Sequence, residues 1–309
     1  MTTILRRLGV VTASIAVTLT VALVGVAVGV GTFLAPPTDS DGYVLLVLGS
    51  DEGPPRGGSA MTGRADGFHL IVVSADHQHA TIMSFPRDTW TSVPGLGNTK
   101  INAALTRGPE NAVAAAERET GLQVDDWIVT GFDGLIMLVG SLGGVQIDVE
   151  QRLTHMSRIE AGPQRLSGTT ALSYLRDRKS RPGGDLDRAE AHGRFLAAVH
   201  QQIVTEGPGL DRLFEHVASL DSYTESSLST TELLRLAAMA LRIPPQNVQR
   251  VRLDGRIGTA GSASVVYLTD AARDVIEEVR VNGMLGMLPE PAVPEPATSE
   301  PAAPEPAAP

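Results

Sequence analysis

Residues 174–196 read Tyr-Leu-Arg-Asp-Arg-Lys-Ser-Arg-Pro-Gly-Gly-Asp-Leu-Asp-Arg-Ala-Glu-Ala-His-Gly-Arg-Phe-Leu, and the rest of the chain is organised around this stretch. Its first part predicts the end of a helix, from which Arg176 and Arg178 project. The pair Gly183-Gly184 predicts a break and then the start of a second helix. Two guanidinium groups and the N-terminus of a helix are therefore close together in the sequence.

Three polar side chains share one face of the second helix. Asp185, Arg188 and His192 stand at positions i, i+3 and i+7, so they project in the same direction. Guanidinium groups, a glycine-opened helix N-terminus and a carboxylate together suit a phosphate-bearing ligand and a metal ion. The alternative from this stretch alone is a charged, solvated loop followed by an ordinary amphipathic helix.

The composition limits the class of protein. A chain of 309 residues with 42% hydrophobic residues has enough apolar material for a folded core. The net charge of -10 argues against a general nucleic-acid binder, which normally has a basic surface. The chain has no cysteine, which excludes disulfides and thiolate chemistry. Only Lys100 and Lys179 among the 25 basic residues are lysine, which indicates a GC-rich genome or a preference for arginine at phosphates.

The N-terminal region predicts a membrane anchor. Residues 8–35 contain no charged side chain, and this length exceeds the roughly 20 apolar residues that cross a bilayer as a helix. Arg6 and Arg7 precede the run, so the positive-inside rule keeps the N-terminus in the cytoplasm. We therefore expect a single-pass protein of the cell membrane with an extracytoplasmic body. The competing interpretation is a cleaved signal peptide, but the apolar part of such a peptide is usually only about 7–15 residues long.

Acidic residues lie at the ends of three predicted strands. The strands are expected at 43–48, 68–74 and 81–85. Asp51 follows the first strand, Asp66 precedes the second, and Asp88 follows the third within Pro86-Arg87-Asp88. Ligand sites of open α/β sheets collect at strand ends, so we expect these carboxylates and Arg87 to lie together.

Strands alternate with predicted helices along the body of the chain. This order predicts a layered α/β/α sandwich, and the hairpin between residues 68 and 85 makes its sheet mixed. We expect three parts: a cytoplasmic stub and transmembrane anchor at 1–38, one extracytoplasmic catalytic domain at 39–286, and a tail at 287–309. The tail repeats Glu-Pro-Ala, which favours an extended, disordered spacer. Further helices are expected at 109–120, 133–142, 231–241 and 270–281, and further strands at 127–130, 145–149, 248–253 and 264–268.

The motifs together resemble the LytR-CpsA-Psr (LCP) family of membrane-anchored bacterial cell-wall phosphotransferases. The resemblance runs from about Val44 to Leu196 and more faintly to about Gly283. Each motif is weak alone, but the order of all of them behind one anchor is specific. The motifs are Leu-Gly-Ser-Asp at 48–51, Gly-Arg-Ala-Asp at 63–66, Ser-Phe-Pro-Arg-Asp at 84–88, Lys-Ile-Asn at 100–102, Leu-Gly-Gly-Val at 142–145, Leu-Ser-Gly at 166–168, Tyr-Leu-Arg-Asp-Arg at 174–178 and Gly-Gly-Asp-Leu-Asp-Arg at 183–188.

This resemblance implies a function and a set of site residues. LCP enzymes move a glycopolymer from a polyprenyl-pyrophosphate carrier onto peptidoglycan with a divalent cation, here expected to be Mg²⁺ or Mn²⁺. The family also implies a mixed-sheet fold with a hydrophobic channel for the prenyl chain. A pyrophosphatase side activity is a further expectation. The matching catalytic carboxylates are Asp51, Asp66, Asp88 and Asp185, of which Asp51 and Asp66 hold the metal; the matching pyrophosphate-binding residues are Arg87, Arg176, Arg178, Arg188 and His192.

One motif departs from the family pattern. His192 stands where the family commonly has Gln, Asp187 replaces a frequent Gly, and Ala191 replaces a frequent Arg. A histidine can donate a hydrogen bond and, when protonated, would add positive charge near the phosphates; it can equally be a packed helix-face residue. The base for the acceptor hydroxyl is expected to be Asp51 or Asp66. The alternative function is a non-catalytic polyprenyl-pyrophosphate or cell-wall binding protein with the same fold.

Overall fold

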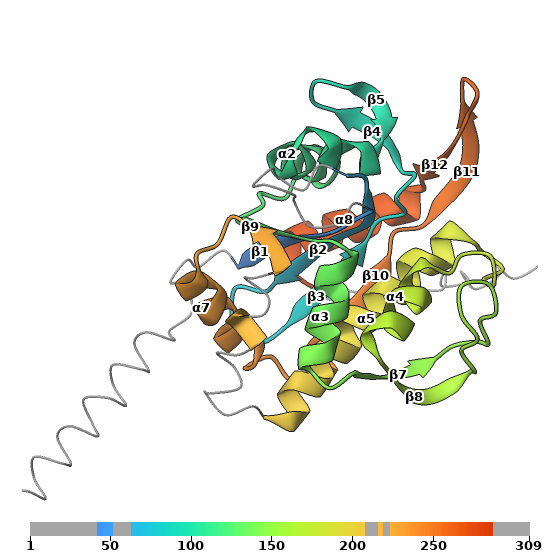
Figure 1. The fold of residues 1–309 in the computed structure, drawn as a ribbon. Coiled ribbons are helices and arrows are strands. Elements are labelled where there is room, and N and C mark those ends of the chain that lie inside the picture. Colours follow the sequence, from blue (N-terminus) through green and yellow to red (C-terminus); the bar gives the residue numbers. More distant parts are fainter. Residues whose placement is uncertain (1–41, 52–62, 208–215, 219–222, 287–309) are drawn as a thin grey trace, which may run out of the picture.

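A six-stranded mixed sheet forms the centre of the molecule (Figure 1). The structure is a computed structural model that describes residues 42–51, 63–207, 216–218 and 223–286. The strand order is β10-β3-β2-β1-β6-β9. The pairs β1–β6 and β3–β10 are parallel and the other neighbours are antiparallel, which confirms the predicted mixed sheet. The strands are β1 (Tyr43–Ser50), β2 (Ala65–Val73), β3 (Ala80–Ser84), β6 (Asp126–Thr130), β9 (Thr224–Ser226) and β10 (Val248–Arg252).

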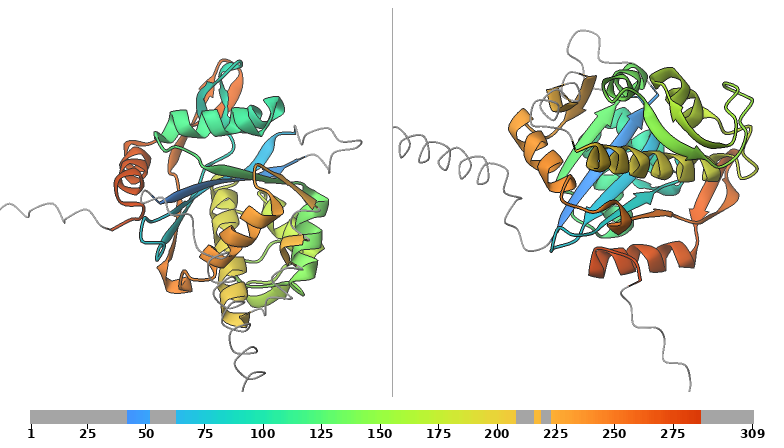
Figure 2. Two further views of the ribbon diagram at one scale, coloured as in Figure 1. Left: turned by 90° about the vertical axis from the view of Figure 1, so that its left-hand side faces the viewer. Right: turned by 90° about the horizontal axis from the view of Figure 1, so that it is seen from below.

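Both faces of this sheet are covered by helices (Figure 2). Because β1 is buried on both faces, it reads as a continuous apolar run rather than an alternating one. Leu46 and Leu48 contribute to the core beneath α2 and α8, whereas Tyr43 and Leu45 belong to the core beneath α7. The helices are α2 (Pro109–Thr120) and α8 (Asp270–Asn282) with the short 3-10 helix η1 (Ile101–Arg107) on one face, and α5 (Asp185–Glu206) and α7 (Thr230–Ala240) on the other.

A subsidiary cluster carries the first part of the stretch at 174–196. The helices α3 (Phe132–Ser141) and α4 (Gly168–Arg176) pack with α5 and with the hairpin of β7 (Val145–Val149) and β8 (Gly162–Leu166). Tyr174, at the end of α4, is fully buried in this cluster. The Ser167 hydroxyl accepts a hydrogen bond from the Thr170 N–H and caps α4, as its sequence predicts. The cluster therefore fixes the end of α4, where Arg176 stands.

Several helix boundaries follow directly from the sequence. Pro109 lies in the first turn of α2, and Gly121 ends that helix in the left-handed conformation, with φ of 71°. α5 continues to Glu206, and Gly207 caps its C-terminus in the left-handed conformation, with φ of 55°. Gly184 has φ of 59° immediately before α5, so the break predicted from the glycine pair is a real backbone feature.

Two hairpins were not predicted from the sequence. They are β4 (Trp90–Val93) with β5 (Gly97–Lys100), and β11 (Gly255–Ala260) with β12 (Ala263–Leu268), of which only β12 was expected. β5 contains no apolar residue and β11 contains two glycines, so neither has the alternation that marks a strand. Both hairpins project from the body of the molecule (Figure 1). The short β8, β9, η1 and the 3-10 helix η2 (Pro245–Asn247) were also missed.

Some expectations concern residues that the structure does not describe. The expected membrane segment at 8–35 and the expected tail at 287–309 lie outside the described residues. Within the ranges given above, no helix combines the length and the apolar character that a membrane span requires.

Candidate active site

The stretch at 174–196 meets the strand ends in one cluster of charges. Asp66 at the start of β2, Arg87 and Asp88 after β3, and Asp185 and Arg188 on α5 form this charge cluster. Arg87 Nη1 lies 2.5 Å from Asp66 Oδ1, and Arg87 Nε lies 3.4 Å from Asp185 Oδ2. Arg188 contacts the same two carboxylates, at 3.0 Å from Asp185 Oδ1 and 3.6 Å from Asp66 Oδ2. The structure thus brings together five of the predicted site residues.

Burial and the neighbouring carboxylates determine the pKa values and the hydrogen bonding of Arg87 and Arg188. Arg188 is buried, and burial lowers its pKa while the Asp185 carboxylate opposes that shift. Burial would also lower the pKa of Arg87, but the charges of Asp185 and Asp66 outweigh it and raise the pKa. Nε of Arg87 and of Arg188 are buried without a hydrogen bond, and so are both carboxylate oxygens of Asp185. Arg87 Nε and the Asp185 oxygens still lie in the ion pairs given above, so Arg188 Nε is the buried donor of this cluster that a further polar ligand could satisfy.

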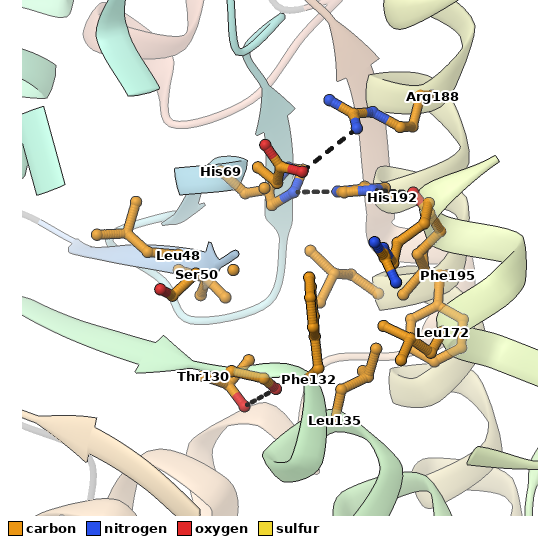
Figure 3. Close-up of a pocket in the computed structure, with 18 residues that line it drawn as sticks. Leu48, Ser50, His69, Thr130, Phe132, Leu135, Leu172, Arg188, His192 and Phe195 are labelled. Atoms are coloured by element: carbon orange, nitrogen blue, oxygen red, sulfur yellow. Dashed lines mark hydrogen bonds and ion pairs between the residues drawn. The ribbon is translucent and has the colours of Figure 1, made fainter. Parts of the chain in front are cut away.

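A cavity with an apolar wall opens beside the charge cluster (Figure 3). We call it the head cavity; its empty volume is about 650 Å³. Asp66, Arg176 and Arg188 contribute the charge to its lining. The rest of the lining is Val47, Leu48, Gly49, Ser50, Gly67, His69, Thr130, Gly131, Phe132, Leu135, Leu172, Leu175, His192, Phe195 and Leu196.

A second, larger cavity lies between the sheet and helices α5 and α7. Its empty volume is about 1200 Å³, and we call it the apolar cavity. Leu196 lines both this cavity and the head cavity, so the two are neighbours along α5. His200 is one of its few polar side chains, and its Nε2 is engaged by the Ala240 carbonyl at 3.0 Å. Most of the lining is aliphatic, including Leu45, Ile71, Val73, Ile82, Val199, Ile203, Val204, Leu233, Leu236, Ala237, Met239 and Ile243.

The third hollow is polar. Arg64, Arg87, Asp88, Thr99, Lys100, Asn102 and Ala103 line it, and we call it the polar pocket. Lys100 Nζ lies 3.0 Å from Asp88 Oδ2, and Arg87 Nε lies 3.9 Å from Asp88 Oδ1. Arg87 lines this pocket while its partner Asp66 lines the head cavity, so the Asp66–Arg87 ion pair stands between the two.

Two histidines form a continuous hydrogen-bond chain beneath the head cavity. His69 Nδ1 lies 3.0 Å from Ser84 Oγ, His69 Nε2 lies 3.3 Å from His192 Nδ1, and His192 Nε2 lies 2.7 Å from the Leu175 carbonyl (Figure 3). A carbonyl only accepts, so His192 Nε2 carries a proton and, in the neutral ring, Nδ1 accepts. His69 therefore donates from Nε2, and the Ser84 hydroxyl donates to His69 Nδ1.

This histidine pair is uncharged at neutral pH. Burial lowers the pKa of His192 to about 3, and the nearby Arg188 adds to the shift. Burial and the neighbouring His192 lower the pKa of His69 well below its usual range. Gly67 makes room for the pair, because a Cβ there would lie 3.1 Å from His192 Nδ1 and 3.2 Å from His69 Nε2. Both ring nitrogens of His192 are thus engaged by protein groups, although the ring lines the cavity.

The two arginines at the end of α4 have different settings. The guanidinium carbon of Arg176 lies 4.5 Å from the centre of the Phe132 ring, a cation–π contact that holds the side chain at the head cavity. Arg178 is exposed and does not line the head cavity, but its charge contributes to lowering the pKa of Arg188. Arg178 is therefore near the charge cluster without contacting its carboxylates within the described residues.

Asp51 lies at the edge of this arrangement. It is exposed, and its Oδ1 accepts a hydrogen bond of 2.7 Å from the backbone N–H of Arg64. Asp51 N also donates to the Arg64 carbonyl, which continues the β1–β2 ladder and places Asp51 across from the segment that leads to Asp66. Among the described residues no group of three or more His, Cys, Asp or Glu side chains is arranged to hold a metal. A metal here would need ligands from a substrate as well.

Sequence reasoning missed several residues of the site. His69 lies within a strand of apolar residues, and its pairing with His192, 123 positions away, leaves no local signal. Phe132 was missed because its role depends on the packing of α3 against α4. Lys100 and Asn102 belong to the Lys-Ile-Asn motif but were not predicted as site residues. Their membership of that motif is the sequence signal that could have placed them in the site.

Comparisons with known proteins identify the family of this chain. The profile of the LytR_cpsA_psr family matches residues 27–280. The chain is 34% identical over 166 residues to the probable cell wall biosynthesis protein LcpB of Corynebacterium glutamicum, covering 51% of this chain and 39% of LcpB. It is 25% identical over 252 residues to the polyisoprenyl-teichoic acid--peptidoglycan teichoic acid transferase TagV of Bacillus subtilis, covering 77% of this chain and 63% of TagV.

Solved structures show the same fold. The crystal structure of B. subtilis TagV superimposes with a TM-score of 0.67 at 21% identity, covering 79% of this chain and 96% of that chain. A structure of TagT bound to LI-WTA superimposes with a TM-score of 0.63 at 20% identity, covering 80% and 91%. The chain spans less than two fifths of the length of LcpB, and likewise of LcpA from the same organism. Because the family profile covers most of the chain, including the motifs that build the charge cluster, this protein belongs to the LytR_cpsA_psr (LytR-CpsA-Psr) family.

Proposed function

We propose that this protein transfers a glycopolymer from a polyprenyl-pyrophosphate carrier to peptidoglycan and releases polyprenyl phosphate. The observation that carries the proposal is the head cavity, where arginines stand at the edge of an apolar wall that leads toward a larger aliphatic cavity. That combination suits an amphiphile with a diphosphate head and a hydrocarbon tail. Relatives named as teichoic acid transferases support the same class of reaction.

The head group would bind through arginines. Arg176 and Arg188 line the head cavity, and Arg87 forms an ion pair with Asp66, which lines it too. Guanidinium groups give bidentate, permanently charged contacts to phosphate oxygens. Phosphoryl transfer depends mainly on alignment and charge neutralisation, and these arginines would provide both for the transferred phosphorus. Arg178 would extend the positive field at the rim.

The prenyl chain would occupy the apolar cavity beyond Leu196. Its lining is aliphatic on the sheet side and on the α7 side, so each methylene transferred from water would contribute about 0.8 kcal/mol to binding. The cavity excludes water from the tail and leaves the head group at the charge cluster. This division agrees with the change in polarity along α5, whose N-terminal part carries Asp185 and Arg188 and whose next turns carry His192 and Leu196.

We propose Asp51 and Asp66 as ligands of a Mg²⁺ or Mn²⁺ ion. The donor set fits, because these carboxylates flank one end of the β1–β2 ladder and Mg²⁺ is commonly held by one or two carboxylates and substrate phosphates. Asp185, whose oxygens lack hydrogen bonds, would support the arginines rather than the ion. When bound, such an ion neutralises the developing charge on the phosphates.

The sequence supports a location of this reaction at a membrane surface. We propose that residues 8–35 anchor the chain with its N-terminus in the cytoplasm, and that residues 39–286 form one extracytoplasmic catalytic domain followed by a spacer at 287–309. The lipid-linked donor would then diffuse in the same bilayer as the anchor. The acidic, extracytoplasmic body leaves no role for nucleic acid.

Turnover by the full-length protein tests this function. The protein in detergent, given a polyprenyl-pyrophosphate-linked glycopolymer, peptidoglycan and Mg²⁺, is expected to release polyprenyl phosphate and to attach polymer to peptidoglycan. The alternative, a non-catalytic binding protein, predicts donor binding without either product. In that case Asp51→Ala or Asp66→Ala would leave binding intact, whereas the transferase loses turnover with either substitution.

A further inference from the structure

The polar pocket and the head cavity meet at the Asp66–Arg87 ion pair. Arg87 lines the polar pocket, Asp66 lines the head cavity, and the two side chains are in contact at 2.5 Å. The polar pocket has an empty volume of about 580 Å³, which is comparable to that of the head cavity. A phosphorus atom held at this ion pair would therefore be accessible from both hollows.

In-line displacement favours separate binding places for the donor and the acceptor, and the two hollows that meet at this ion pair offer them. The attacking and leaving oxygens lie roughly on opposite sides of the transferred phosphorus. The leaving polyprenyl phosphate belongs with the head cavity, because only that side has the apolar wall and the neighbouring aliphatic cavity. The attacking hydroxyl then arrives from the polar pocket.

The lining of the polar pocket combines charged groups with groups that can bind a hydroxyl. Lys100 is paired with Asp88 at 3.0 Å and Arg87 with Asp66 and Asp185, whereas the exposed Arg64 makes no side-chain ion pair within the described residues. Asn102 is 4% exposed, yet within the described residues its side-chain amide makes no hydrogen bond. An amide that both donates and accepts is the group that recognises a sugar hydroxyl or acetamido group.

Asp88 is the carboxylate that faces this pocket. Asp66 is held by Arg87 and Arg188 and lines the other cavity, whereas Asp88 lines the polar pocket beside Lys100 and Asn102. In the transfer the acceptor oxygen forms a bond to phosphorus, and the bond from phosphorus to the polyprenyl-phosphate oxygen breaks with its electrons. The hydroxyl proton passes to the Asp88 carboxylate.

We propose that the polar pocket is the acceptor subsite, that it binds an N-acetylhexosamine of a glycan strand through Asn102, and that Asp88 accepts the proton of the attacking hydroxyl. This assignment rests on the proposed transferase function. It moves the role of base from Asp51 or Asp66, where the sequence alone had placed it, to the carboxylate on the acceptor side.

The test separates acceptor from donor binding in the full-length protein. Soluble peptidoglycan glycan strands are titrated calorimetrically without donor, and geranylgeranyl pyrophosphate is titrated without acceptor. Asn102→Ala is expected to weaken glycan binding about tenfold, as for one lost hydrogen bond, and to leave the donor Kd within about twofold. Asp88→Asn is expected to lower the rate of transfer at saturating acceptor by about 100-fold or more and to remove a base limb from its pH profile.

Asn98→Ala is the matched control, because Asn98 is exposed on the same hairpin and outside the pocket. It is expected to change neither titration. If a thermal melt shows that Asn102→Ala is unfolded, the same two titrations are made with Thr99→Val, which removes a different hydroxyl-binding group from the lining of the polar pocket. The proposed subsite is wrong if the glycan binds equally well to the wild type and to Asn102→Ala. It is also wrong if Asn102→Ala loses affinity for the donor as much as for the glycan. Failure of wild-type transfer with intact, Asn102-dependent glycan binding would instead reject the proposed function alone.

Discussion

His192 connects the sheet to the end of α4. The chain from Ser84 through His69 and His192 ends on the carbonyl of Leu175, one residue before Arg176. Because α4 ends at Arg176, no backbone N–H of the helix donates to the Leu175 carbonyl. The imidazole N–H of His192 donates to it instead. The histidine pair therefore supports the end of α4, where Arg176 lines the head cavity, and does not supply charge to that cavity.

The neutral histidine pair predicts a particular dependence of stability on pH. Both pKa values are lowered in the folded state, so below about pH 6.5 the unfolded chain binds protons that the folded chain does not. Stability contributed by the neutral pair is present above pH 6.5 and is lost as the pH falls toward 3. Urea denaturation between pH 5 and 6.5 should show a slope approaching about 2.7 kcal/mol per pH unit from the two groups.

The double variant His69→Leu/His192→Gln should flatten that slope. His79→Ala should keep it, because His79 lies in the turn after β2, away from the pair. An unchanged slope in the double variant would mean that the two rings are not buried as neutral partners.

Arg176 is the arginine whose loss should affect donor binding most simply. It contacts Phe132 and lines the head cavity, but it makes no ion pair with the charge cluster within the described residues. Arg176→Ala should weaken binding of geranylgeranyl pyrophosphate about 10- to 100-fold, measured by calorimetry, as expected for lost charge-assisted hydrogen bonds. Arg176→Lys should recover only part of this affinity, because an ammonium cannot reproduce a bidentate contact. Arg107→Ala, an exposed residue at the end of η1, should have no effect, and an equal loss there would point to net charge alone.

At the scale of elements, the loop between α4 and α5 is fastened by buried polar contacts. Arg181 forms an ion pair with Glu150 and donates to the carbonyls of Asp177 and Tyr174 at 2.9 and 3.1 Å. The buried carboxylate of Asp177 accepts hydrogen bonds from Ser180, which holds the turn itself. Burial lowers the pKa of Arg181 to about 10, so it stays charged at neutral pH. This loop sets the distance between Arg176 and the start of α5.

Removing Arg181 should be costly to the fold. Its side chain is 1% exposed, and Arg181→Met would remove the partner of Glu150 Oε1 and of two carbonyls, while Glu150 Oε2 would keep its hydrogen bond from Tyr174. We expect the free energy of unfolding to fall by about 3 kcal/mol, measured by urea denaturation. Arg158→Met is the matched control, because the Arg158–Glu160 pair lies at the surface and should leave stability unchanged. A small effect of Arg181→Met would show that this loop does not hold the two helices together.

The sequence predicts elements whose signals are local and misses those that depend on partners. α2 is bounded by Pro109 and Gly121, and β1 is an apolar run, so both follow from residue chemistry. β5 and β11 exist because another strand pairs with each, and neither carries a pattern of its own. The same holds in the site: motif order found the charge cluster, whereas contacts across the fold determine the His69–His192 pair and the polar pocket.

At the scale of the whole molecule, two neighbouring cavities differ in character. In the proposed function the charge cluster and the head cavity would accommodate the diphosphate end of the donor, and the apolar cavity between the sheet and α7 would accommodate its hydrocarbon. Length of the prenyl chain should therefore contribute to affinity independently of the head group. A long prenyl chain buries more methylenes in the apolar cavity than a short one, and each buried methylene adds to the free energy of binding.

A substitution deep in the apolar cavity should make this dependence visible. Ala237→Phe places a ring in the lining on α7 and should weaken binding of a C55 prenyl pyrophosphate about tenfold or more, by loss of buried methylenes. Binding of geranyl pyrophosphate, which is too short to extend far beyond Leu196, should stay unchanged in the same calorimetric assay. Ala271→Phe on the exposed side of α8 is the control and should affect neither ligand. Equal losses for both ligands would contradict a separate tail site.

The position of a bound donor tests the account most directly. A crystal structure of the full-length protein, or of its complex in detergent by cryo-EM, would be determined with a polyprenyl pyrophosphate and Mg²⁺. We predict the diphosphate within hydrogen-bond reach of Arg176 and Arg188, next to the Asp66–Arg87 ion pair, and the prenyl chain running past Leu196 toward α7. A diphosphate bound away from Arg176 and Arg188, or a chain that leaves the apolar cavity empty, would contradict the account.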